Sequence, residues 1–83
     1  MSMTPQQCRM ARAALGWSVQ ELGERAGVRP NTVSSFERGG ASYRSTAAAL
    51  QAALESAGAI FIGDGEASDG GGPGVRVMQP SDP

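Results

Sequence analysis

Apolar residues recur at helical spacing along most of the chain, and glycines or polar residues separate the repeats. A spacing of three or four residues places side chains on one face of a helix, so the pattern predicts four helices. We expect them over residues 5–15, 19–26, 30–38 and 46–57. The buried stripes on and beside these helices would carry Cys8, Ala11, Leu15, Leu22, Ala26, Val28, Val33, Phe36, Ala47, Leu50, Leu54 and Ala57.

Capping signals mark the predicted helix ends. Thr4 precedes Pro5 and lies three residues before Gln7, which is the spacing of a capping box with proline in the first turn. Ser18 and Glu21 have the same spacing at the start of the second helix. Glycines suit the left-handed conformation at helix C-termini, and one follows each of the four helices, as Gly16, Gly27, Gly39 and Gly58. The short Gly27 turn between the second and third helices predicts a helix-turn-helix.

The sequence changes character after Gly58. Residues 59–62, Ala-Ile-Phe-Ile, and residues 75–77, Val-Arg-Val, have the composition and alternation of short strands. The Gly-rich segment between them is too long for a tight turn, so the strands pair either within the chain or between two chains. We therefore expect a helical domain over 4–58, a β and dimerisation segment over 59–78 and a disordered tail over 79–83.

Composition narrows the classes of function. A chain of 83 residues forms one small domain with a modest core, and a second copy is the most available source of further stability. The chain has no His and one Cys, so we expect no disulfide within the chain, no metal site, no cofactor and no enzymatic activity. It has no apolar run long enough to span a membrane and no signal-peptide pattern, which predicts a cytoplasmic protein with no membrane contact.

The net charge of −1 is unevenly distributed. Residues 1–58 contain six Arg and four Glu, whereas residues 59–83 contain one Arg and four acidic residues. Every basic residue is Arg, whose planar guanidinium suits phosphates and guanine edges, although a high-GC genome would give the same bias. The candidates for neutralising phosphates are Arg12, Arg25, Arg38 and Arg44, and ion pairs to nearby Glu are the alternative for Arg25 and Arg38.

The predicted third helix combines its buried stripe with a polar opposite face. Arg29, Asn31, Thr32 and Ser35 occupy that face, where a solvated helix would more often carry Glu, Lys, Gln or Ala. The major groove of DNA admits a helix and displays a distinct donor and acceptor pattern for each base pair. Arg suits guanine, Asn suits adenine, and Thr offers a methyl group to thymine or a hydroxyl to phosphate. The pattern therefore predicts contacts to bases, with an ordinary solvated face as the alternative.

The segment ARAALGWSVQELGERAGVRPNTVSSFERG resembles the XRE family, the lambda-repressor-like helix-turn-helix regulators of bacteria and phages. The resemblance covers roughly residues 6–57, and LGWS, ERAGV and TVSSFERG carry it. It implies a mainly α, four- or five-helix bundle, here followed by a short C-terminal strand or hairpin, whose third helix enters the major groove. The implied base contacts are Arg29, Asn31, Thr32 and Ser35, and the implied DNA-backbone contacts are Ser18, Gln20, Arg38, Tyr43, Arg44 and Ser45. The chain departs from the family at Val19, Gly23 and Arg29, where Gln, Ala and Ser are frequent.

Two functions fit this sequence. The first is a sequence-specific regulator, most simply a dimeric repressor that recognises an inverted repeat in double-stranded DNA. The second is an antitoxin-like or antiactivator module of the same fold, which binds a protein partner through its C-terminal segment. We expect the first function, with a homodimer formed through Ile60, Phe61, Ile62, Val75 and Val77. Trp17 and Cys8 are expected to be packing residues.

Overall fold

A computed structural model describes residues 3–63 and 72–78 of the chain. This part contains α1 (Pro5–Leu15), α2 (Val19–Ala26), α3 (Pro30–Glu37), α4 (Arg44–Ser56), β1 (Ala59–Ile62) and β2 (Gly74–Val77). The prediction of a mainly α fold with a C-terminal hairpin is therefore confirmed. The tail over 79–83 and most of the Gly-rich segment lie outside the described residues.

One predicted helix start is wrong. The polar residues 42–45 were expected to form a loop, but α4 already begins at Arg44, and Tyr43 is its N-terminal cap residue. From Arg44 onward the sequence contains neither Gly nor Pro before Gly58, so nothing in it prevents the helix from extending backward into this stretch. Arg44 and Ser45 consequently lie in the first turn of α4.

The capping signals place the first two helices as predicted. The Thr4 hydroxyl accepts a hydrogen bond from the Gln7 backbone N–H at 3.0 Å, and the Gln7 side chain accepts one from the Thr4 N–H at 3.0 Å. At α2 the Ser18 hydroxyl accepts from the Glu21 N–H at 3.0 Å. The Glu21 carboxylate, predicted to return that bond, instead binds Arg25 Nε at 2.6 Å.

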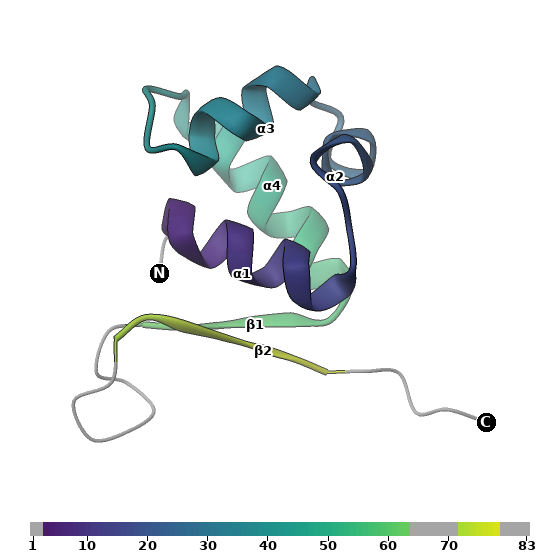
Figure 1. Ribbon diagram of the computed structural model, residues 1–83, viewed down its shortest axis with the longest axis vertical. Coiled ribbons are helices and arrows are strands. Elements are labelled where there is room, and N and C mark those ends of the chain that lie inside the picture. The colour runs from purple at the N-terminus through teal and green to yellow at the C-terminus, as the bar shows by residue number, and fades with distance from the viewer. Residues whose placement is uncertain (1–2, 64–71, 79–83) are drawn as a thin grey trace.

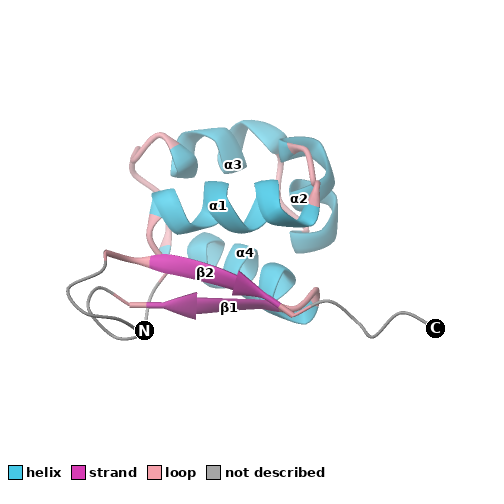
Figure 2. Ribbon diagram, turned by 60° about the horizontal axis from the view of Figure 1, so that its bottom comes forward, coloured by secondary structure: helices cyan, strands magenta, loops and turns pink. Residues whose placement is uncertain are grey.

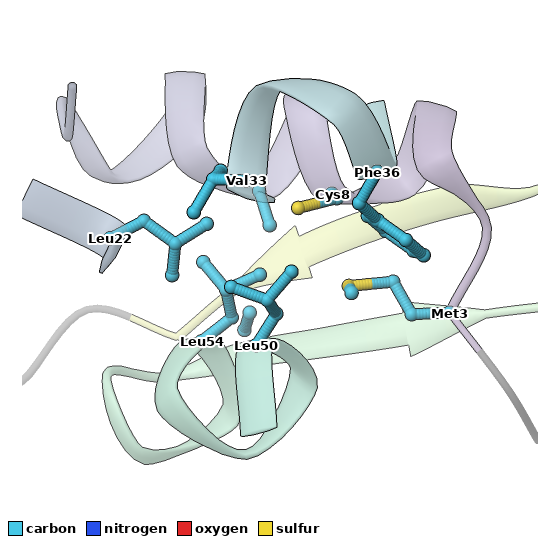
Figure 3. Packing of buried hydrophobic residues seen from close by; sticks show 9 residues of the cluster. Met3, Cys8, Leu22, Val33, Phe36, Leu50 and Leu54 are labelled. Carbon is cyan, nitrogen blue, oxygen red and sulfur yellow. The ribbon is translucent and has the colours of Figure 1, made fainter. Parts of the chain in front are cut away.

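The core lies where the four helices and the hairpin meet. Side chains from all four helices converge there, as Figure 3 shows for Cys8, Leu22, Val33, Leu50 and Leu54, each of which is fully buried. Phe36, Met3, Ala11 and Ala59 complete the buried cluster. The predicted helical stripes thus form the core, with Leu15, Ala26, Val28 and Ala47 packed at its margin. Ala57, which was predicted to be buried, is instead half-buried at the C-terminal cap of α4.

Gly23 allows α2 to lie close to the turn that leads into α3. A glycine in a helix costs about 1 kcal/mol relative to alanine. Here, however, a Cβ atom at position 23 would lie 2.7 Å from the carbonyl oxygen of Val28. The Val28 N–H also donates to the Gly23 carbonyl at 2.9 Å, which closes the end of α2. The chain's departure from alanine at this position therefore has a steric reason.

The two strands form an antiparallel hairpin within the chain, which is one of the two pairings that the sequence left open. Ala59 pairs with Val77, Ile60 with Arg76, Phe61 with Val75, and Ile62 with Gly74. Helix α1 packs along β2, and α4 contacts β1. Figure 1 shows α3 at one end of the molecule and the hairpin at the other, with α1 and α4 between them, and Figure 2 shows the two strands side by side.

Gln7 attaches the hairpin to α1. Its side chain is fully buried, and its Nε2 donates to the carbonyl oxygens of Ile62 at 2.8 Å and Gly74 at 3.0 Å. Because Ile62 and Gly74 are paired residues, one amide group holds both strands at the same point. The Gln7 side chain therefore joins the capping box of α1 to the last pair of the hairpin.

Candidate nucleic-acid interface

The polar face of α3 is directed away from the core. Arg29 and Asn31 are exposed, and Thr32 and Ser35 are half-buried, whereas Val33 and Phe36 of the same helix are buried. Arg29 occupies the N-terminal cap position and makes no capping hydrogen bond with its side chain. The predicted base-contacting side chains therefore lie along one side of the helix, where a DNA groove can reach them.

Three of these residues also line an open groove of about 340 Å³ between α3 and the start of α4. Its walls are Asn31, Thr32, Ser35, Ala41, Ser42, Tyr43 and Thr46. Tyr43 is 82% exposed, so most of this residue is open to solvent. The structure thus brings a predicted DNA-backbone contact next to three predicted base contacts.

The remaining predicted DNA-backbone residues lie mainly at helix N-termini. Ser18 caps α2 and Gln20 lies in its first turn, while Arg44 and Ser45 lie in the first turn of α4, and all four are exposed. Backbone N–H groups at such termini are oriented to bind anions such as phosphate. Arg38 is exposed at the C-terminal end of α3.

Charge is distributed unequally between the arginines of this region. Within residues 3–63 and 72–78, Arg29, Arg38 and Arg44 take part in no salt bridge. Arg25 pairs with Glu21 and lies over the Trp17 ring, with its guanidinium carbon 4.4 Å from the ring centre. The alternative of ion pairing therefore holds for Arg25, and Trp17 has a packing role as expected.

Arg12 forms a salt bridge with the buried carboxylate of Glu37. Its Nε and Nη2 donate to the two oxygens of Glu37, each at 2.9 Å, and its Nη1 donates to the Trp17 carbonyl at 3.1 Å. The hydrogen bond to Glu37 raises the pKa of Arg12, so the guanidinium stays charged. Sequence reasoning missed this pair. Its one local signal is that Glu37 follows Val33 by four residues, on the buried side of α3.

The Glu37 pair fixes the end of α3 against α1. The Cys8 thiol donates to Glu37 Oε2 at 3.4 Å, and Arg9 Nη1 donates to the Glu37 backbone carbonyl. Three side chains of α1 therefore bind one residue in the last turn of α3. This attachment holds the polar face of α3 in a fixed orientation relative to the bundle.

Cys8 is expected to resist alkylation in the native protein. Burial, followed by the charge and hydrogen bond of Glu37, raises the pKa of the Cys8 thiol from 9.0 to about 12. Because only the thiolate reacts, iodoacetamide at pH 8 should label the folded chain roughly a thousandfold more slowly than the unfolded chain. Mass spectrometry with and without denaturant measures the ratio. Comparable labelling rates in both states would contradict the buried site.

The residues predicted for dimerisation divide between two faces of the hairpin. Phe61 and Val75 pack against the helices. Val77 lies two residues after Val75 in β2, so its side chain is on the same inner face, whereas that of Arg76 is on the outer face. Ile60, 42% exposed, and Ile62 lie on the outer face.

No helix in the described residues is long and apolar enough to cross a membrane.

Comparison with known proteins identifies the helical part of this arrangement. A family model described as helix-turn-helix matches residues 9–55. This match runs from α1 to α4 and includes the whole of α2 and α3, but it ends before β1. No curated protein matches the chain.

Proposed function

Because this chain belongs to the helix-turn-helix family whose model matches residues 9–55, and is thus an XRE-like DNA-binding regulator, we propose that it represses transcription as a homodimer on an inverted repeat. In this proposal α3 enters the major groove, and Arg29, Asn31, Thr32 and Ser35 contact bases. The contacts to the DNA backbone come from Ser18, Gln20, Arg38, Tyr43, Arg44 and Ser45.

The observation that carries the proposal is the contrast between the two sides of α3. Its inner side is apolar except for Glu37, which is buried and paired, so the helix exposes no carboxylate to repel phosphates. Its outer side offers a guanidinium, an amide and two hydroxyls next to an open groove. That combination of donors and acceptors matches base edges in the major groove.

A dimer is supported by the small number of available cations. Arg29, Arg38 and Arg44 of one chain neutralise few phosphates, and a second copy doubles that number. Two recognition helices of a symmetric dimer contact half-sites roughly 34 Å apart, one turn of the duplex. We further propose that residues 4–58 form the DNA-binding domain, that residues 59–78 form the dimerisation segment, and that the protein acts in the cytoplasm.

Selection from a random duplex pool tests the proposal, and an inverted repeat should be enriched. Asn31→Ala should then reduce discrimination at one base pair of each half-site by about 1–3 kcal/mol, because it removes a bidentate contact. Arg38→Ala should weaken binding to all sequences alike and reduce the salt dependence by about one charge. Gln6→Ala, an exposed amide on α1, is the matched control and should change neither quantity.

A folded protein that enriches no sequence would contradict the proposal. That result would favour the second function, an interaction module whose protein partner binds the C-terminal segment. Enrichment of a single half-site without a repeat would preserve DNA recognition by α3 but remove the dimer.

A further inference from the structure

Among residues 3–63 and 72–78, no strand other than β2 lies beside β1, so one edge of β1 has backbone groups without a neighbouring strand. The Met78 N–H donates to the Gly58 carbonyl at 2.8 Å, which makes these two residues a hydrogen-bonded pair just beyond the hairpin. Hydrogen-bonded pairs alternate along an antiparallel ladder, so Ile60–Arg76 and Ile62–Gly74 are the next two. The N–H and C=O groups of Ala59 and Phe61 consequently point away from β2, toward the free edge.

The two edges of the hairpin are protected unequally. Helices pack against both strands, α1 along β2 and α4 against β1, but only β2 carries a charged residue, Arg76. β1 consists of Ala-Ile-Phe-Ile, with no charge and no proline. Isolated edges are usually blocked by charges, prolines or bulges, because a bare edge pairs with another strand. Such an unblocked edge is suited to a strand from a second molecule.

We propose that two copies of this chain join β1 to β1 and form one continuous four-stranded sheet. The inference deepens the proposed function, and it rests on that function only where it uses the direction of α3. A symmetric antiparallel pairing centred on Ile60 sets Ala59 of each copy opposite Phe61 of the other. These are the residues whose backbone groups are free, so the register forms two hydrogen-bonded pairs and leaves no outward group of β1 unmatched. The two Ile60 side chains then meet on the outer face.

This pairing also directs both recognition helices to the same side. The two-fold axis between adjacent antiparallel strands runs perpendicular to the sheet. Ala59, Phe61 and Val75 show that the helices cover only the inner face of the hairpin, and α3 lies at the far end of that bundle (Figure 1). In the four-stranded sheet both helical bundles therefore lie on the same face, side by side. Both α3 helices then face the same direction, parallel to the two-fold axis, where one DNA duplex can contact both.

Stacking of the outer faces gives a different result. If Ile60 and Ile62 of one hairpin packed against those of another, the axis would lie parallel to the sheets. The two α3 helices would then point in opposite directions and could not contact the same stretch of duplex. The edge pairing is therefore the arrangement that agrees with recognition of an inverted repeat.

Disulfide trapping in the full chain distinguishes these arrangements. In the proposed register the two Ile60 Cα atoms are about 4.5 Å apart, as in a pair without hydrogen bonds. Cysteines at such a separation form disulfides. The matched control is Arg76→Cys, on the same face but on β2, which would lie about 14 Å from its symmetry mate across three strand intervals. Cys8 is fully buried and does not compete.

After mild oxidation, Ile60→Cys should give a covalent dimer as its main product on a non-reducing gel, and Arg76→Cys should remain a monomer. Dimers from both variants would show face stacking, and dimers from neither would show that β1 forms no interface; either result overturns the proposal. Circular dichroism confirms the fold of each variant. A trapped Ile60→Cys dimer that binds no selected DNA would leave the interface standing and contradict the proposed function instead.

Discussion

Replacing Glu37 with alanine is expected to lower the free energy of unfolding by about 3 kcal/mol, because it leaves the Arg12 guanidinium without its buried counter-ion. The side chain of Glu37 is 6% exposed and that of Arg12 is 22% exposed. Arg12 keeps its bond to the Trp17 carbonyl and some contact with water, which places the loss at the lower end of the 3–5 kcal/mol typical of broken buried pairs. Urea denaturation followed by circular dichroism measures the change.

The exposed pair between Arg25 and Glu21 supplies the control. Its 2.6 Å separation is shorter than the 2.9 Å of the buried pair, yet its side chains are 54% and 41% exposed. Glu21→Ala should therefore cost less than about 1 kcal/mol, since water screens the pair. Equal losses in Glu21→Ala and Glu37→Ala would mean that burial does not determine the contribution.

A double replacement separates the charge from the packing at this site. Arg12→Met combined with Glu37→Leu removes both charges and keeps most of the apolar volume. It should recover much of the stability lost in Glu37→Ala, as replacement of whole buried ion pairs does in other proteins. If this double variant regains stability but binds DNA more weakly than the unchanged protein, the Arg12–Glu37 pair also orients α3.

The sequence predicted the helices well because their ends are determined by neighbouring residues. The Thr4–Gln7 box and the caps at Gly16 and Gly27 act over three or four positions, and each appears in the structure. The start of α4 lacks such a signal: Tyr43 makes no capping bond with its side chain, and the polar run over 42–45 is typical of a loop. Local chemistry thus explains both the correct boundaries and the incorrect one.

The candidate interface was predictable for a related reason. Helical periodicity alone separates Val33 and Phe36 from Asn31, Thr32 and Ser35, and the structure exposes or half-exposes the polar set. The pairing of Glu37 and the bonds from Gln7 Nε2 to the hairpin were not predictable, because these partners lie 25 to 67 positions away in the chain. A glutamate or glutamine is expected to be exposed, and its burial cannot be predicted when the partners that make it possible are distant in the sequence.

Gln7→Glu is expected to cost about 3–5 kcal/mol of stability, although it changes one NH₂ group into an oxygen. The Gln7 Nε2 donates to two carbonyl oxygens at 2.8 and 3.0 Å, so a carboxylate in its place would set a buried negative charge against both. The Oε1 acceptor for the Thr4 N–H is kept, and the capping box therefore survives. Thermal and urea denaturation measure the loss.

Gln7→Met tests whether charge is the cause of that loss. This variant removes the two donors and the cap acceptor but introduces no charge, and Ile62 and Gly74 remain paired with each other in the hairpin. It should cost about 1–3 kcal/mol, less than Gln7→Glu. Gln6→Glu, an exposed neighbour on the same helix, should be close to neutral. If Gln7→Met were the more damaging variant, loss of the hydrogen bonds rather than the buried charge would dominate, and the amide of Gln7 would be the main link that holds the hairpin to α1.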